Sequence, residues 1–164
     1  MKKILTAIVC CMALCIFSGC ITVPVGAEKI AASPEEIVSI EVYYFEDAIY
    51  REDGQWMKYS YQDGEEIRTS YEAEPIASVK QEDYAQFIAD YEELPFTMTF
   101  IIFAAMDPSW YYMGYVVKVT TEDTYYLYTS QAGGSMAYCK DEIWEEFLKK
   151  YIGEEPFQIV KENK

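Results

Sequence analysis

The sequence contains no histidine among its 164 residues. This absence excludes Ser-His and Cys-His nucleophile pairs, zinc sites with imidazole ligands and histidine-based pH switches. Basic residues are also few, with 13 Lys and Arg against 28 Asp and Glu, and the formal net charge is −15. Nucleic-acid binding needs a clustered basic surface. Because the basic residues here are scattered among acids, we expect no nucleic-acid partner.

Cysteine is scarce beyond the N-terminal region. Cys10, Cys11 and Cys15 lie in an apolar run near the start of the chain, which leaves Cys20 and Cys139 for the remainder. We therefore expect no internal disulfide. Cys139 precedes a predicted helix start, where a thiol of lowered pKa would be reactive. A small buried apolar side chain is the favoured interpretation, because no histidine is present as its partner.

No pattern of a catalytic or metal site is complete. A calcium loop needs Asp or Asn at alternating positions, and the acidic segments around Asp53 and Asp63 lack this alternation. Residues 133–137 are similar to a nucleophile elbow, but the last glycine is replaced by Ala137 and no histidine activates Ser135. We predict no catalytic residue, no metal site and no cofactor.

The first residues have the pattern of a signal peptide. Lys2 and Lys3 precede an apolar run over residues 4–17, which gives the charged start and the length of an h-region. The segment Phe17-Ser18-Gly19-Cys20 that follows resembles the lipobox of bacterial lipoproteins, although Phe17 replaces the usual aliphatic residue. The resemblance implies cleavage before Cys20 and a diacylglyceryl group on the thiol of Cys20.

Two acyl chains are sufficient for stable membrane anchoring, so a lipid on Cys20 would place the chain on the outer face of the cell membrane. Two alternatives stay open: secretory cleavage after Ala27, and an uncleaved anchor from Ile4 to about Val25. All three place the folded part outside the cytoplasm. The predicted organisation is a signal peptide (1–19), a lipidated cysteine and tether (20–36), one domain (37–153) and a polar tail (154–164).

Period-two alternation predicts several strands. The first lies at the start of the domain, with one apolar face formed by Val38, Ile40, Val42 and Tyr44. Asp53-Gly54 and Asp63-Gly64 are typical of tight hairpin turns, so residues 48–71 are expected to form a meander. Further strands are predicted over residues 75–79, 96–103, 113–121, 124–130 and 135–139.

Two amphipathic helices are predicted from helical spacing of apolar residues. The first covers residues 81–94, with an apolar stripe of Tyr84, Phe87, Ile88, Tyr91 and Leu94. The second covers residues 141–152, with Asp141 as its N-cap and Gly153 as its stop. The expected fold class is α+β: a single domain whose antiparallel sheet has two amphipathic helices packed on one face.

A valine-rich strand over residues 114–119, the tyrosine-rich strand after it and a closing helix with Phe147, Tyr151 and Ile152 follow one another in the second half of the chain. With these features the chain resembles, over residues 37–152, small and poorly characterised lipoproteins of Gram-positive bacteria. The resemblance implies a location at the cell envelope. It implies no chemistry, because such proteins share no known activity.

Aromatic residues are abundant, at 16% of the chain with 16 Tyr and 3 Trp. Strand alternation places some of the tyrosines between residues 111 and 128 on the sheet face away from the helices. Exposed tyrosines form good protein-binding or sugar-binding surfaces, whereas rings that pack across strands are structural, which is the favoured interpretation. The candidate binding residues are Trp110, Tyr115, Tyr126 and Tyr128.

The predicted function is a lipid-anchored binding module at the cell envelope, with a protein or glycan partner and no enzymatic activity. One alternative is an immunity-like or inhibitory protein whose acidic surface neutralises a basic partner. A second and less favoured alternative is a carboxylate-based hydrolase of wall glycans, which needs a buried acid of raised pKa in a cleft.

Overall fold

A computed structural model describes residues 21–25, 27, 29–52, 55–63, 65–100, 111–130 and 137–162. Antiparallel strands and α-helices form a single α+β domain, which confirms the predicted fold class. The elements are β1 (Ile21–Val25), η1 (Pro34–Glu36), β2 (Ile37–Glu52), β3 (Gln55–Gln62), β4 (Glu65–Tyr71), β5 (Ala77–Ser78), η2 (Gln81–Asp83), α2 (Tyr84–Glu92), β6 (Phe96–Phe100), β7 (Tyr111–Thr121), β8 (Tyr125–Thr129), β9 (Ala137–Tyr138), α3 (Asp141–Ile152) and α4 (Glu155–Glu162).

The main sheet is organised around the long strand β2. Its strand order is β4-β3-β2-β7-β8, and the short β5 also pairs with β2. A second, smaller sheet has the order β1-β6-β9. Every pairing among the described strands is antiparallel. Each predicted strand is found within the described residues, although the one expected over 75–79 is limited to Ala77–Ser78. The outer parts of two of them, 101–103 and 135–136, lie outside the described residues.

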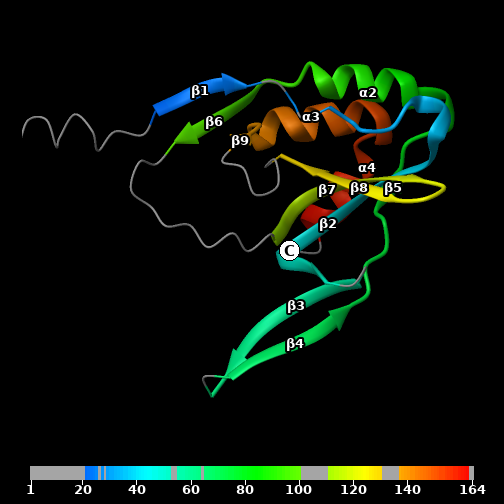
Figure 1. Cartoon of the computed structure of the whole chain (residues 1–164). Helices are drawn as coiled ribbons and strands as arrows, with labels where there is room; N and C mark the ends of the chain where they lie inside the picture. Colours follow the sequence, from blue (N-terminus) through cyan, green and yellow to red (C-terminus); the bar gives the residue numbers. More distant parts are fainter. Residues whose placement is uncertain are drawn as a thin grey trace, which may run out of the picture.

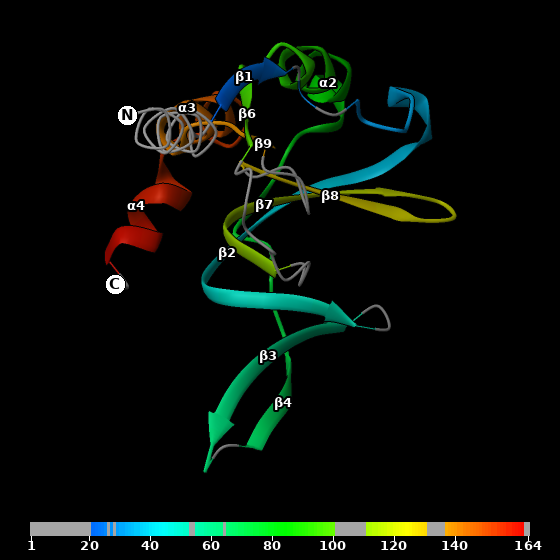
Figure 2. The ribbon, with the colours of Figure 1, turned by 60° about the vertical axis from the view of Figure 1, so that its left-hand side comes forward.

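The antiparallel pairing of β2 with β3 and of β3 with β4 confirms the predicted meander. Glu52 pairs with Gln55, and Gln62 pairs with Glu65, so each connecting loop has two residues. Asp63 has a φ of 56°, the positive value that a two-residue hairpin turn of type I′ requires. The hairpin of β3 and β4 projects from the body of the protein, at the end opposite to β1 and the helices α2 and α3 (Figures 1 and 2).

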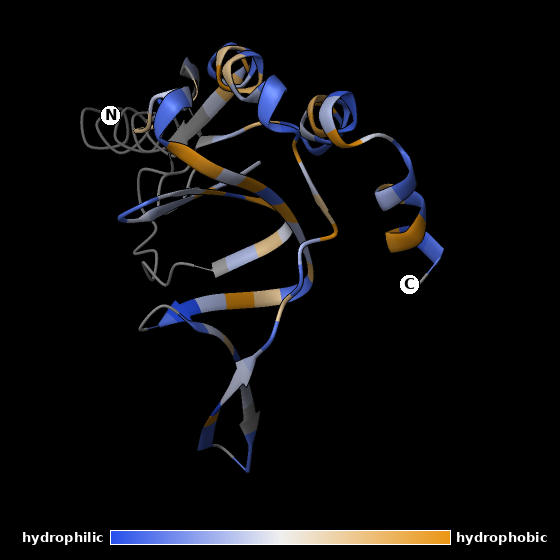
Figure 3. Ribbon diagram, turned by 90° about the vertical axis from the view of Figure 1, so that its right-hand side faces the viewer, coloured by the Kyte–Doolittle hydropathy of each residue, from blue (hydrophilic) through white to orange (hydrophobic). Residues whose placement is uncertain are grey.

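Helices α2 and α3 cover one face of the main sheet (Figure 1). The residues buried between them, which we call the main core, include Phe87 and Tyr91 of α2 and Trp144, Phe147 and Leu148 of α3. Ring contacts join the two helices, with centroids of Phe87 and Phe147 4.8 Å apart. Figure 3 shows that hydrophobic residues gather in this body, whereas the projecting hairpin is mostly hydrophilic. The predicted helices are confirmed, and most residues of their apolar stripes are buried, but Ile88 is half-buried and Ile143, on the expected stripe of the second helix, is 36% exposed.

The opposite face of the sheet carries a smaller apolar cluster of Tyr43, Phe45, Ile49, Trp56 and Val116, which we call the second cluster. The Trp56 ring of β3 lies 4.8 Å from the Phe45 ring of β2, between centroids. Arg51 at the end of β2 stacks on Trp56 and on Tyr125 of β8, at 4.5 and 4.7 Å from the ring centroids. The end of β2 therefore curls back over the sheet, and both sheet faces are apolar.

The domain extends beyond both predicted boundaries. Within the predicted tether, residues 21–25 form β1, and Ile30 and Ala32 are buried in the main core. The predicted polar tail instead forms helix α4, which buries Phe157 and Val160. These two residues are three positions apart and so share one helix face. Because the residues around them are mostly polar, these two apolar positions were too few to predict an amphipathic helix.

Two local predictions differ from the structure. Val38 is 61% exposed rather than buried with Ile40, because a register shift between Ile37 and Ser39 turns the chain. Lys140, not Asp141, is the N-cap of α3, and the Asp141 carboxylate accepts a hydrogen bond from Ser130 Oγ at 3.0 Å. Gly153 does end the helix as predicted, with a φ of 76°.

Within the described residues, no helix combines the length and apolar character that a membrane span requires.

Asp90 connects α2 to α3. Its carboxylate accepts hydrogen bonds from Lys150, from the Tyr151 hydroxyl and, at 2.7 Å, from Gln86 Nε2. These donors, with Lys150 as the largest contribution, lower the pKa of Asp90 to about 2. The folded pKa thus lies below that of the unfolded chain, so the stabilisation is fully present above about pH 4 and is lost as the pH falls toward 2.

Replacing this carboxylate should therefore reduce the acid sensitivity of the fold. We expect Asp90→Asn to lower the free energy of unfolding at neutral pH by up to about 1 kcal/mol, as for other partly exposed ion pairs. Between about pH 4 and pH 2 the variant should lose less stability than the wild type. Urea denaturation at several pH values measures both effects. Glu92→Gln, an exposed acid on the same helix, is the control, and equal acid sensitivity of Asp90→Asn and wild type would contradict the assignment.

Candidate functional site

Two of the predicted binding residues are buried. Tyr115 is 8% exposed and Tyr128 is 7% exposed, and both belong to the main core. The hypothesis that they lie on an exposed sheet face is therefore wrong. Tyr126 is half-buried and packs against the same core, and Trp110 lies outside the described residues.

The physical reason is that both faces of β7 and β8 are apolar. Tyr115 and Val117 of β7 face the helices, whereas Val116 faces the second cluster. Alternation separates the two sets of residues but does not say which set meets the helices. In β8 the side chains of Tyr126 and Tyr128 face the helices. The ring centroids of Tyr128 and of Tyr91 on α2 are 5.2 Å apart.

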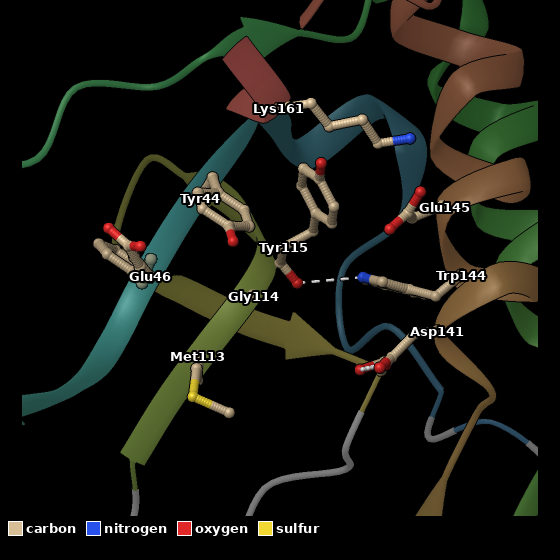
Figure 4. A pocket seen from close by; sticks show the side chains of 11 residues that line it. Tyr44, Glu46, Met113, Gly114, Tyr115, Asp141, Trp144, Glu145 and Lys161 are labelled. Carbon is tan, nitrogen blue, oxygen red and sulfur yellow. Dashed lines mark hydrogen bonds between the residues drawn. The ribbon is translucent and has the colours of Figure 1, made fainter. Parts of the chain in front are cut away.

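A pocket of about 260 Å³ opens where the helix layer ends over the sheet (Figure 4). Strands β2 and β7 form its floor, the first turns of α3 form one wall, and the last turn of α4 contributes Lys161. Gly114 lies in the floor opposite Phe45, beside a register shift of β2. Its φ of 75° is a conformation that other residues rarely adopt, so glycine supports the shape of the floor.

Aromatic rings form the inner part of the pocket. Tyr44 and Tyr115 pair across β2 and β7, with ring centroids 4.9 Å apart. Trp144 of α3 donates a hydrogen bond from Nε1 to the Tyr115 carbonyl oxygen at 3.0 Å, which fixes the indole (Figure 4). Burial, followed by the negative charge of Glu145, raises the pKa of Tyr115 to about 12. Its hydroxyl therefore stays protonated at neutral pH.

Charged residues form the outer part of the pocket. Glu46, Asp141 and Glu145 supply three carboxylates, and Lys161 supplies one ammonium group. None of the four makes an ion pair with another residue in the described ranges. Glu46 and Glu145 lie on opposite sides of the aromatic rings in Figure 4. Because carboxylates outnumber the ammonium group, the potential inside the pocket is negative.

The projecting hairpin is a second candidate site. All seven residues of β4 are exposed, and β4 lies at the edge of the sheet with β3 as its neighbour. On one face Tyr50 and Tyr59 stack with ring centroids 4.4 Å apart, and the Arg68 guanidinium lies 5.0 Å from the Tyr59 ring. Near its tip the hairpin carries Asp63 and Glu65, both exposed. The hairpin thus combines an open strand edge with an acidic tip.

Other chemistry receives little support from the described residues. Cys139 is 2% exposed, and burial raises the pKa of its thiol, so the interpretation of a buried apolar side chain is confirmed. No aspartate or glutamate in the described ranges is buried, whereas the hydrolase alternative needs a buried acid. No cluster of three or more potential metal ligands occurs in this part of the chain. Ser135 lies outside it.

Comparisons with protein families, with curated proteins and with solved structures find no match for this chain. Its function is therefore inferred from its own residues and their geometry.

The burial of Tyr128 predicts a large structural role for this residue. We expect Tyr128→Ala to lower the free energy of unfolding by about 3 kcal/mol or more, as for other aromatic residues removed from a core. Tyr138→Ala is the matched control, because Tyr138 is 41% exposed and should change stability by roughly 0.5 kcal/mol or less. Urea denaturation of both variants measures the difference. Similar small losses in the two would show that Tyr128 is not a core residue.

Proposed function

We propose that the protein is a lipid-anchored binding module on the outer face of the cell membrane, and that its β3–β4 hairpin contacts a basic protein. The exposed hairpin is the observation that carries this proposal. From Tyr59 onward, β3 pairs with β4 but not with β2. A two-stranded hairpin is marginally stable in water, and proteins usually protect an open strand edge. A partner that covers β4 would satisfy its free backbone groups and stabilise the hairpin.

The charge of the chain favours a basic partner. With a net charge of −15, the protein repels acidic proteins and attracts basic ones, and complementary charge speeds association. Asp63 and Glu65 concentrate negative charge near the hairpin tip. Self-pairing of two hairpins is disfavoured, because it would bring these like charges together.

The proposed anchor would orient the hairpin relative to the membrane. Cys20, the proposed lipidation site, directly precedes β1 in the sequence. The hairpin lies at the opposite end of the body from β1 (Figures 1 and 2). A lipid on Cys20 would thus hold the β1 end close to the membrane and leave the hairpin pointing away from it.

The immunity-like alternative is a special case of this proposal, in which the basic partner is a toxin or an enzyme. It uses the same surface and the same electrostatic attraction. A glycan partner would make different contacts, since a neutral sugar gains little from carboxylates and binds mainly through aromatic stacking. Salt dependence therefore separates a basic protein from a neutral glycan.

Site-specific photocrosslinking in intact envelopes tests the proposal. A photoreactive residue at Thr69 on β4 should crosslink to a basic protein, whereas the same residue at Gln158 on α4 should not, because both positions are exposed but only Thr69 lies on the hairpin. The yield at Thr69 should fall several-fold in about 0.5 M salt and in the variant Asp63→Asn/Glu65→Gln. Glu142→Gln/Glu155→Gln, with the same charge change on the helices, should leave it unchanged.

Three outcomes would contradict the binding role of the hairpin. They are equal crosslinking from Thr69 and Gln158, capture of acidic proteins only, and capture of wall glycan only. A yield at Thr69 that is unaffected by salt would contradict the electrostatic part of the proposal.

The anchor makes a separate prediction. Cys20→Ser removes the thiol that would carry the lipid, so the protein should no longer partition into the detergent phase of a Triton X-114 extract. Cys139→Ser, which changes a buried thiol far from the N-terminus, should still partition there. Mass spectrometry of the wild-type N-terminus should find a diacylated Cys20. A mature chain that begins at Glu28, or one that retains the first residues, would instead establish secretory cleavage or an uncleaved anchor.

A further inference from the structure

The pocket beneath the first turn of α3 combines two kinds of surface. Its inner part is aromatic, formed by Tyr44, Tyr115 and Trp144, and its outer part carries three carboxylates against one ammonium group. This combination attracts a positive charge and also contacts carbon atoms. It is separate from the hairpin, which supplies none of the lining residues.

A metal ion does not suit this lining. Calcium and magnesium require six or more oxygen ligands at short distance, and no group of potential ligands in the described residues lies close enough to hold a metal. Aromatic faces and the Met113 side chain favour an organic cation, through cation–π attraction and through contacts of the thioether with carbon.

We propose that this pocket binds a primary ammonium group on a short apolar chain. Such a group has three N–H donors, and the pocket offers carboxylate oxygens together with the Tyr115 hydroxyl. The apolar chain would lie against the aromatic rings. At about 260 Å³, the pocket is smaller than the roughly 300–1,000 Å³ of pockets for drug-sized ligands. It therefore fits a small amine or the end of one lysine side chain.

Glu145 is the main counter-ion of the bound ammonium group. It is half-buried and lines the pocket together with Tyr115, whose pKa is raised first by burial and then by the negative charge of Glu145. Glu46 is exposed at the opposite side of the rings (Figure 4) and adds long-range attraction. Lys161 extends over the pocket from α4 (Figure 4). Its positive charge therefore repels the ammonium group of the ligand and weakens binding.

Titration of the ¹⁵N-labelled chain, without its signal peptide, tests the proposal. The probes are n-butylammonium, the neutral 1-butanol and the anionic butyrate. The reporters are the Trp144 indole N–H, which is held by Tyr115 at 3.0 Å, and the amide of Gly114. We expect saturable shifts with n-butylammonium and at least tenfold weaker binding of 1-butanol and butyrate, because only the cation is attracted by the carboxylates.

Charge variants make the test specific to the pocket. Glu145→Gln should weaken n-butylammonium binding at least fivefold, whereas Lys161→Met should strengthen it about threefold, since it removes a repelling charge. Glu142→Gln is the matched control on the same helix, because it makes the same change outside the pocket. A variant with a structural defect would not strengthen binding, so Lys161→Met keeps the test decisive if Glu145→Gln fails to fold.

A lysine-containing tripeptide with blocked ends separates the two sources of the ammonium group. Tighter binding of this peptide than of n-butylammonium assigns the pocket to a lysine side chain, and the reverse assigns it to a free amine. Equal binding of 1-butanol and n-butylammonium, or weaker binding in Lys161→Met than in wild type, would overturn the proposal. Hairpin variants should not change these titrations, so this site and the proposed protein partner can fail independently.

Discussion

The pairing of β2 with β7 is the interaction on which the rest of the structure depends. The two strands are in register from Ile40 to Phe45 on β2 and from Val119 to Gly114 on β7. Residues of both strands enter the main core on one face and the second cluster on the other. The same register places Tyr44 beside Tyr115 in the pocket floor. Slipping it by one residue would exchange the two faces and destroy all three features.

The sequence predicted the local elements well, because each has a strong local signal. The Asp-Gly turns define the hairpins, Pro95 follows the first helix, and Gly153 ends the second. It could not predict which face of β7 meets the helices, because Tyr115 and Val116 are equally suited to a core. Alternation between apolar and polar residues identifies the buried face only where the other face is polar. This sheet is covered on both sides, so alternation alone could not decide whether Tyr115 and Tyr128 are core or surface residues, and their burial agrees with the favoured interpretation of structural rings.

The ends of the domain were missed for a different reason. β1 and α4 are short, and they are held by contacts with distant parts of the chain, β1 by pairing with β6 and α4 by packing on the core. The Phe157 ring lies 4.7 Å from the Tyr115 ring, between centroids, and Ile30 is buried beside elements far along the chain. Short helices are marginal in water without such tertiary contacts. Their existence therefore depends on a core that the local sequence does not describe.

The pocket also depends on tertiary contacts, because its charged and aromatic residues are brought together only by the fold. Glu46, Met113, Glu145 and Lys161 come from four different elements, so no motif in the sequence joins them. Lys161 reaches the pocket because Phe157 and Val160 fix α4 against the core. Asp141 lies in the first turn of α3 and lines the pocket from there. In a chain with 28 acidic residues, most carboxylates solvate the surface. Those of the pocket differ because they lie beside fixed aromatic rings. A cation that enters there loses bound water, and it gains attraction to the carboxylates and to the aromatic faces.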